Sequence, residues 1–232
     1  MATRQRLTRK DMRQDQFVST MLKTRDYVED NLTYFLAAIG GIVVVAIAVF
    51  LLVSSGQSKA HEAQAQFGKA AVEYRGGNFQ LAIADFQTVV DNYGGTEAAG
   101  LSTYYIANAY FELKNYSEAQ KYFQIYVDSY NTDPMINAGA LAGLGHCLRA
   151  MGEPADAASE FHELVRKYPN SYLRKDALFY GSECYAEAGD NENAMALYEQ
   201  FADVPGEAQR ALQLKQLLIE KGAIDPAVGN YD

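Results

Sequence analysis

Three histidines and two cysteines carry the most versatile chemistry in this sequence, because imidazole and thiolate groups bind metals and act in catalysis. His61, His146 and His162 have no histidine four residues away and no Cys or acidic partner at a metal-ligand spacing. We expect no metal site and treat the histidines as surface residues. The two cysteines, Cys147 and Cys184, lie 37 residues apart in the sequence.

Signatures of common enzymes are missing from the sequence. It contains no GxSxG, P-loop, Rossmann glycine pattern, HExxH or CxxC. The GGN at residues 76–78 has no Lys-Ser/Thr at P-loop spacing after it, so a turn explains it better than a phosphate cradle. We therefore predict no catalytic residues, no cofactor and no enzyme activity. Only acidic residues support an enzyme, and a solvated face explains them equally well.

The charge of the chain is unevenly distributed. The whole sequence carries −9, from 20 Lys and Arg against 29 Asp and Glu, which disfavours nucleic-acid binding. Residues 1–32 contain seven basic and five acidic residues, whereas the remainder contains 13 basic and 24 acidic ones. We expect the two parts to occupy different surroundings.

A long uncharged run separates these two parts. Residues 33–53 include no charged side chain, and about 20 helical residues cover the roughly 30 Å of a bilayer core. A buried core helix would show a polar face, and a signal peptide would have a shorter apolar stretch nearer the N-terminus. We predict a retained transmembrane helix, with cleavage after residues 54–56 as the alternative.

The distribution of Lys and Arg predicts the orientation of this helix. Seven basic residues precede the run, and only Lys59 and Lys69 follow it within 20 positions. The positive-inside rule then places the N-terminus in the cytoplasm. The protein is predicted to be a single-pass protein of a bacterial inner membrane, with residues 54–232 in the periplasm.

The exported part is built from a repeated unit with a period of 37 or 38 residues. A small residue recurs once in each unit, and an aromatic residue follows four positions later. The small residues are Ala82, Ala119, Ala157 and Ala194, and the aromatic residues are Phe86, Phe123, Phe161 and Tyr198. Such a period predicts stacked repeats that bury their apolar faces against one another.

Each unit is predicted to be two helices joined by a tight turn. Ile106, Ala107 and Tyr110 share one face of a helix with a 3.6-residue period, as do the matching residues of the next unit. The turns are Gly77-Asn78, Lys114-Asn115, Gly152-Glu153 and Gly189-Asp190. The cysteines then occupy one place in successive units. Neighbouring helix axes lie about 8 to 10 Å apart, whereas a disulfide needs Cα atoms within about 7 Å, so we expect two free, largely buried thiols.

The predicted fold class is all-α. A transmembrane helix is followed by an α-solenoid of about four helix pairs and a C-terminal capping helix that ends at Gly222. The predicted boundaries are 1–32 for a cytoplasmic basic tail, 33–53 for the transmembrane helix, 54–62 for a short linker, 63–206 for the repeats, and 207–232 for the capping helix and tail.

The repeats resemble the tetratricopeptide repeat (TPR) over about residues 60–205. Ala107 and Gly145 stand at its eighth place, Tyr110 and Leu148 at its eleventh, and Pro169 at its thirty-second. Ala and Phe or Tyr fill the twentieth and twenty-fourth places. The sequence departs from the family pattern in having no Trp, a period about three residues above 34, and a poorly matching helix at residues 64–75.

This resemblance implies that binding occurs on the concave wall formed by the first helix of each pair. The candidate partner-binding residues are Tyr104, Asn108, Phe111, His146, Arg149, Phe179 and Glu183. TPR domains that clamp a C-terminal carboxylate use Lys at the fifth place, where this chain has Tyr104, Ala142 and Phe179. We therefore expect aromatic anchors that hold an extended or helical peptide, with a purely structural role as the alternative.

The layout of basic tail, single span and acidic repeats resembles the YfgM-like family. That resemblance implies a scaffold accessory to the Sec translocon or to periplasmic chaperones, with translocon subunits, chaperones or exported clients as partners. Nucleic acids and small-molecule substrates are not expected as ligands. The alternative is an envelope organiser that coordinates cell division, cell-wall synthesis or outer-membrane assembly. BamD-like lipoproteins and soluble YbgF-like coordinators share the repeats but lack such an anchor.

Overall fold

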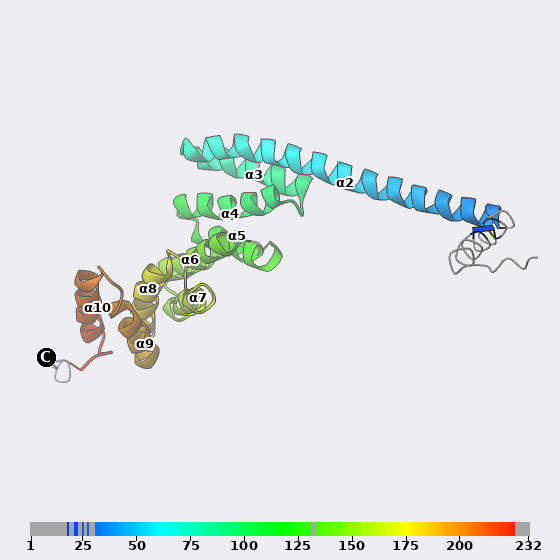
Figure 1. Ribbon diagram of the computed structural model, residues 1–232. Coiled ribbons are helices and arrows are strands. Elements are labelled where there is room, and N and C mark those ends of the chain that lie inside the picture. The colour runs from blue at the N-terminus through cyan, green and yellow to red at the C-terminus, as the bar shows by residue number, and fades with distance from the viewer. Residues whose placement is uncertain are drawn as a thin grey trace, which may run out of the picture. The chain divides into compact units, whose positions relative to one another are not determined.

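The computed structural model describes residues 31–130 and 133–225, together with Val18, Met21, Leu22, Arg25 and Tyr27. These residues form helices and loops without a strand (Figure 1), which confirms the all-α prediction. The chain divides into two compact units, Met1–Ser58 and Lys59–Asp232. The helices are α2 (Leu32–Arg75), α3 (Phe79–Tyr93), α4 (Glu97–Glu112), α5 (Tyr116–Ser129), α6 (Pro134–Met151), α7 (Pro154–Lys167), α8 (Arg174–Glu187), α9 (Asn191–Ala202) and α10 (Ala208–Glu220).

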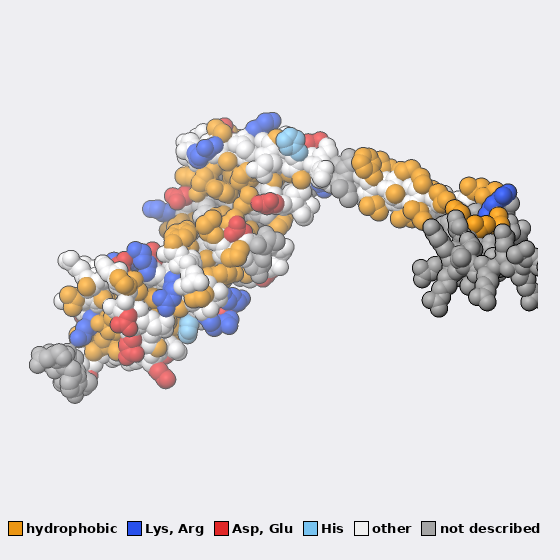
Figure 2. Space-filling view, viewed as in Figure 1, with side chains coloured by type: hydrophobic (Ala, Val, Ile, Leu, Met, Phe, Trp, Pro, Cys, Tyr) orange, Lys and Arg blue, Asp and Glu red, His pale blue; other side chains and the backbone are white. Residues whose placement is uncertain are grey.

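The first unit consists, among the described residues, mainly of the apolar part of α2. An 18-residue window of this helix has a mean hydropathy of 3.1, so the helix is long and apolar enough to cross a membrane. Hydrophobic side chains cover its described surface in Figure 2 and are exposed, as at Ile42, Val44 and Phe50. Residues 54–62, predicted as a linker, are helical and lie within α2. Most of the predicted basic tail, residues 1–32, lies outside the described residues.

The predicted turns between paired helices are present in the second unit. At each turn one residue has a left-handed backbone, with φ from +59° to +81°, and the next residue is the N-cap of the following helix. The left-handed residues are Gly77, Lys114, Gly152 and Gly189. Glycine adopts this conformation without steric cost, and Lys114 is the one non-glycine described with a positive φ.

The helices of the second unit pack in chain order, each against the one before it, from α3 to α10. The end of α2 completes the first pair: the Phe67 ring lies 5.5 Å from the Phe86 ring and 5.6 Å from the Tyr105 ring. At the other end, α10 packs on α8 and α9 and buries Leu214 and Leu218. The predicted capping helix is therefore confirmed, and the weakly matching residues 64–75 form a helix that packs as expected.

The repeated alanine and aromatic positions form the core, with one exception. The four repeated alanines are fully buried, and Phe86, Phe123 and Phe161 are at most 1% exposed. Tyr198 also packs against the core, but it is only partly buried. The large, fully buried side chains of α9 are Leu197 and Phe201, which lie three and seven residues after the buried Ala194 and share its face of the helix.

Close helix approach depends on glycine at the eighth place of the third pair. A Cβ atom at Gly145 in α6 would lie 2.7 Å from the Phe161 ring of α7, which is closer than van der Waals contact permits. Phe161 is itself buried on all sides. The ring of the second helix therefore lies directly against the backbone of the first.

We predict that Gly145→Ala destabilises the repeats by about 1 to 3 kcal/mol, because the added methyl group overpacks the Phe161 site. Gly68→Ala in α2 is the matched control, since no atom lies within 4 Å of its added Cβ. That substitution should stabilise the helix by up to about 1 kcal/mol. Unfolding of the full chain in detergent, followed by far-UV circular dichroism, measures both. Equal effects of the two substitutions would contradict this packing.

Candidate functional site

The predicted site residues lie on the first helices of three successive pairs. Those helices are α4, α6 and α8, and α4 also contacts α6 directly. Tyr104, Asn108 and Phe111 come from α4, His146 and Arg149 from α6, and Phe179 and Glu183 from α8. Spacings of three and four residues place the members of each group on one face of their helix.

Four of these residues surround a single hollow, which we call the α4–α6 hollow. It has a volume of about 210 Å³ and is bounded by α4, α6 and the connection between α7 and α8. Its lining includes Tyr104, Asn108, Phe111, Phe123, Ala142, His146, Tyr172 and Leu173. Aromatic and aliphatic surfaces dominate, as is usual in sites that bury part of a ligand.

Two glycines of α6 let aromatic side chains of the lining lie against its backbone. A Cβ atom at Gly139 would lie 2.6 Å from the Tyr104 hydroxyl oxygen, and one at Gly143 would collide with the Phe123 ring. The aromatic side chains of α4 and α5 therefore lie against the bare backbone of α6. Ala142, on the same helix, adds only a methyl group to the lining.

Two polar side chains interrupt the apolar lining contributed by α4. The Asn108 side-chain amide donates a hydrogen bond from Nδ2 to the Tyr104 carbonyl oxygen, over 2.8 Å. With Nδ2 used as the donor, the Asn108 Oδ1 atom is the atom of this side chain that can accept a hydrogen bond. Burial raises the pKa of the Tyr104 hydroxyl, so the phenol stays neutral. The hollow thus suits an uncharged side chain whose backbone reaches these polar groups.

His146 forms an aromatic part of the same wall. Its ring makes T-shaped contacts with the Phe161 and Tyr180 rings, whose centroids lie 5.1 and 5.0 Å away. Burial lowers the pKa of His146, and the positive charge of Arg149 lowers it further. His146 is thus partly buried, and its surroundings disfavour the charged form of its imidazole.

Arg149 and Glu183 bind each other across α6 and α8. The guanidinium donates from a terminal nitrogen to a Glu183 carboxylate oxygen over 2.8 Å, and it stacks 4.9 Å from the Tyr180 ring centroid. Glu183 is only 9% exposed. Removing Arg149 would leave the largely buried Glu183 carboxylate without its countercharge. The pair therefore joins two repeats, and its arginine is already neutralised by a carboxylate of the same chain.

Phe179 belongs to a different neighbourhood, close to the capping helix. Its ring lies 5.5 Å from the Phe201 ring, and the Arg210 guanidinium of α10 lies 4.7 Å from its centroid. Neither Phe179 nor the Arg149–Glu183 pair belongs to the lining of the α4–α6 hollow. The predicted wall is thus divided into a hollow and an internally bonded surface.

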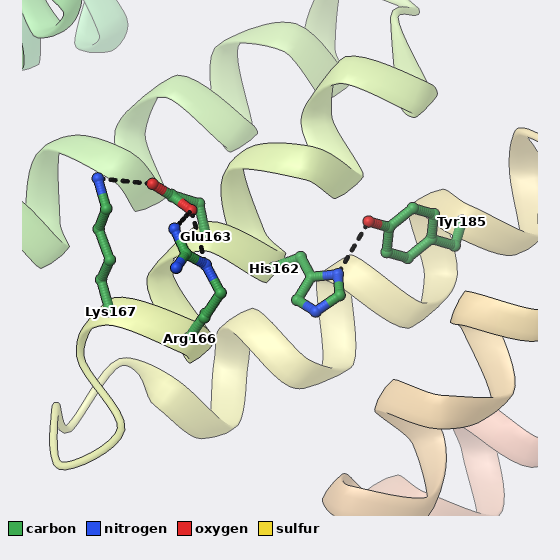
Figure 3. Close-up of polar contacts among 5 residues, drawn as sticks. All are labelled: His162, Glu163, Arg166, Lys167 and Tyr185. Carbon is green, nitrogen blue, oxygen red and sulfur yellow. Dashed lines mark hydrogen bonds and ion pairs between the residues drawn. The ribbon is translucent and has the colours of Figure 1, made fainter.

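The remaining cysteines and histidines have structural surroundings. Cys147 and Cys184 are unbonded and fully buried, as predicted, and burial raises the pKa of each thiol to about 12. The His162 Nδ1 atom lies 3.0 Å from the Tyr185 hydroxyl, joining α7 to α8 (Figure 3). His61 is exposed. The described residues contain no cluster of three possible metal ligands.

Tyr172 and Leu173 line the hollow but were not among the predicted residues. They lie in the connection between α7 and α8, whereas the TPR pattern points only to positions on first helices. Their sequence context offers one signal, which is an aromatic residue directly after the turn-forming Pro169, Asn170 and Ser171.

The lowered pKa of His146 gives a testable pH dependence. Because folding lowers its pKa, the unfolded chain binds this proton more tightly, and stability falls as the pH drops below the unfolded value of about 6.5. We expect the wild type to lose more unfolding free energy than His146→Gln between pH 7.5 and 5.5. His61→Gln, at an exposed position, should follow the wild-type profile. Parallel profiles for wild type and His146→Gln would contradict the assignment.

Comparisons with solved structures support the same fold. The TPR protein YrrB, described as having an unusual peptide-binding site, is 23% identical with a TM-score of 0.54, over 66% of this chain and 74% of that one. PilF of Pseudomonas aeruginosa is 18% identical with a TM-score of 0.53, over 69% and 73%. MamA is 14% identical with a TM-score of 0.53, over 73% and 97%. At these identities the likeness shows the fold alone.

The family comparison agrees with the structure. The tetratricopeptide repeat family matches residues 46–97, 67–134 and 143–211, which together cover more than half of the chain. A search among curated protein sequences finds no significant match. TPR repeats are scaffolds for protein–protein interaction and are typically non-enzymatic. The chain belongs to the tetratricopeptide repeat family.

Proposed function

We propose that this chain is a membrane-anchored TPR scaffold that binds a segment of a partner protein in the α4–α6 hollow. The observation that carries the proposal is the hollow itself, where Tyr104, Asn108, Phe111 and His146 surround about 210 Å³ of accessible space. Its neutral, mostly apolar lining fits one large uncharged side chain, with peptide groups bonded to Asn108. Arg149, Phe179 and Glu183 would extend the wall beside it.

The membrane anchor is supported by the apolar part of α2. Its described side chains expose a hydrophobic surface all round, which is costly in water and favourable in lipid. The basic residues that precede it favour a cytoplasmic N-terminus, and residues 54–232 would then lie in the periplasm. The proposed division is 1–32 for the tail, 33–53 for the span, 54–62 for a helical linker, 63–206 for the repeats and 207–232 for the cap and tail.

The proposed partners are translocon subunits, periplasmic chaperones or exported clients, as in the YfgM-like family that the layout resembles. An exported client presents unfolded segments with large apolar side chains, and the hollow suits such side chains. An envelope organiser for cell division or outer-membrane assembly is the second candidate, because related repeats occur in proteins of that kind. Enrichment of the protein at division sites would favour the organiser.

A photo-crosslinking amino acid at Phe111 should capture partners of the hollow in living cells. The matched control is the same amino acid at Leu212, which is 63% exposed on α10 and far from the lining residues in sequence. We expect products specific to position 111 that contain translocon subunits, chaperones or exported clients. No partner above background, or the same products at both positions, would count against the hollow as a binding site.

Membrane insertion and orientation can be tested separately. We expect the protein to remain in the membrane pellet after alkaline carbonate extraction, because about 20 apolar residues insert stably. Protease added to spheroplasts should digest residues 54–232. Release by carbonate would refute the anchor, and protection of residues 54–232 would reverse the orientation.

A further inference from the structure

A second hollow lies at the edge of the repeats where α5 is followed by α6. It has a volume of about 610 Å³ and is bounded by the start of α4, the end of α5 and the start of α6. We call it the acidic hollow. Its lining includes Glu97, Leu101, Tyr126, Ser129, Asp133 and Ile136. It is therefore larger than the α4–α6 hollow, and it differs from that hollow in having two carboxylates in its lining.

The acidic hollow and the α4–α6 hollow follow the same two helices. On α4, Leu101 lines the acidic hollow and Tyr104 lines the α4–α6 hollow, and on α6 Ile136 and Gly139 do the same. A spacing of three residues keeps each of these pairs on one face of its helix. The Tyr104 ring also contacts the Tyr126 ring, with centroids 5.7 Å apart. The two hollows are therefore neighbours along α4 and α6.

One buried hydroxyl in the acidic hollow is unpaired. Tyr126 is only 2% exposed, and its hydroxyl forms no hydrogen bond with the residues that the structure describes. The other helix pairs have Val89, Leu164 and Phe201 at this place, seven residues after the repeated alanine, and all three are fully buried. Packing therefore requires an apolar side chain at this place and gives no reason for a hydroxyl.

The carboxylates of this hollow also retain unused acceptor atoms. The Asp133 Oδ1 atom caps α6 by accepting hydrogen bonds from the backbone N–H groups of Met135 and Ile136, over 2.7 and 3.3 Å, which leaves its Oδ2 atom available. Glu97, in the first turn of α4, forms no ion pair with a described residue. Burial, together with the Asp133 and Glu97 carboxylates, raises the pKa of Tyr126 to about 12, so its phenol stays neutral beside them.

No cation within the described chain compensates these carboxylates. The lining contains neither lysine nor arginine. Lys167 lines an adjoining hollow at the start of α6, where Glu163 binds it over 2.6 Å. Lys59 of α2 is exposed and forms no ion pair with a described residue, and Asp128 near the end of α5 adds a further negative charge. The local potential therefore favours a cationic group.

We propose that the acidic hollow binds a Lys or Arg side chain of the same partner segment that places an apolar side chain in the α4–α6 hollow. The ammonium or guanidinium group donates hydrogen bonds to Asp133, to Glu97 and to the hydroxyl oxygen of Tyr126. The aliphatic part of the basic side chain lies along Leu101 and Ile136. The inference rests on the proposed function and adds the sign and the position of a charge on the partner.

A basic side chain suits this hollow better than a metal ion. Calcium takes about six to eight oxygen ligands, whereas the described residues contain no group of three His, Cys, Asp or Glu that could hold a metal. Lys and Arg side chains combine an apolar stem with a charged end, which matches a lining of apolar side chains and carboxylates. Metal binding is therefore treated as an opposing outcome of the test.

The distance between the hollows predicts the spacing of the two anchors on the partner. Glu97 and Leu101 lie seven residues before Tyr104 and Asn108 on α4, which is about 10 Å at roughly 1.5 Å per helical residue. An extended chain rises about 3.3 Å per residue. The basic and the apolar side chains are therefore expected roughly three or four residues apart.

The test uses fluorescein-labelled synthetic peptides of about 12 residues and the full chain in nanodiscs of neutral lipid. Each peptide contains one Phe in a background of Ser and Gly, with one Lys, Arg or Gln placed two to five positions before or after it. We expect the best Lys or Arg peptide to bind about tenfold more tightly than the Gln peptide of the same spacing, because its hydrogen bonds are charge-assisted. Fluorescence polarisation measures the affinities.

Charge-removing variants then locate the basic side chain. Glu97→Gln with Asp133→Asn should remove most of the preference for Lys or Arg, and asparagine still caps α6. The matched control is Asp190→Asn with Glu220→Gln, which makes the same change in net charge outside the hollow and also retains a helix cap. This control should keep the preference.

A conservative variant tests the unpaired hydroxyl. Tyr126→Phe removes one oxygen atom and should lower the preference for Lys or Arg by about threefold, with no loss of thermal stability by far-UV circular dichroism, because the hydroxyl has no partner in the fold. Tyr110→Phe is its control, since Tyr110 is partly buried and lies outside both hollows.

Four results would overturn the inference. Equal affinities for the Lys, Arg and Gln peptides, with binding that still requires the Phe, would refute the acidic hollow and leave the proposed function intact. Absence of binding by every peptide would refute both. Equal loss of preference in the test and control variants would show that net charge alone attracts basic peptides. Calcium binding by isothermal titration calorimetry that is lost in Glu97→Gln with Asp133→Asn, without any preference for Lys or Arg, would assign the hollow to a metal ion.

Discussion

Contact between an aromatic or aliphatic side chain and a helix backbone without a Cβ atom is the constraint on which the repeats depend. An added Cβ would lie 2.7 Å from the Phe161 ring at Gly145, and 2.8 Å from a Leu197 methyl carbon at Gly181. A helical glycine costs about 0.5 to 1 kcal/mol relative to alanine. Full burial of a large apolar side chain contributes about 1.5 to 3 kcal/mol. The close approach is therefore favourable despite the glycine.

The same constraint shapes the surface as well as the core. Gly139 and Gly143 lie four residues apart on α6, so both fall on one face of that helix. They allow Tyr104 and Phe123 to rest on the α6 backbone, and with Ala142 they leave the α4–α6 hollow between α4 and α6. A Cβ atom at either glycine would collide with the Tyr104 or Phe123 side chain. The same glycines thus determine how these helices pack and which side chains line the hollow.

Much of the fold could be predicted from the sequence because it depends on local and periodic signals. The turns at Gly77, Gly152 and Gly189 need a left-handed residue, and the buried alanines recur with the period. Tyr198 is less buried than the other repeated aromatic residues, because Leu197 takes a buried position on α9 and the pattern contains no information about small helix rotations. The turn at Lys114 could be predicted only because it aligns with the glycine turns of the other units. Lysine itself does not favour the left-handed backbone that Lys114 adopts.

The candidate site was harder to predict, because its boundaries depend on contacts between elements. Position rules for first helices found Tyr104, Asn108, Phe111 and His146, which the structure brings together. They could not find Tyr172, which reaches the hollow from a loop. The rules also placed Arg149 in the same binding surface as these residues. They could not show that Arg149 forms an ion pair with Glu183, because the two residues lie on different helices and are 34 positions apart in the sequence.

The arginines and lysines of the repeats differ in how they are compensated. Arg149 is compensated by a partly desolvated carboxylate and by the Tyr180 ring, so it would lose those partners in binding an anion. Arg166 and Lys167 are exposed, and one carboxylate serves both. Exposed rim charges act mainly on association rate and orientation, whereas buried apolar contacts slow dissociation. A ligand of the α4–α6 hollow would therefore depend on its apolar side chain more than on a charge.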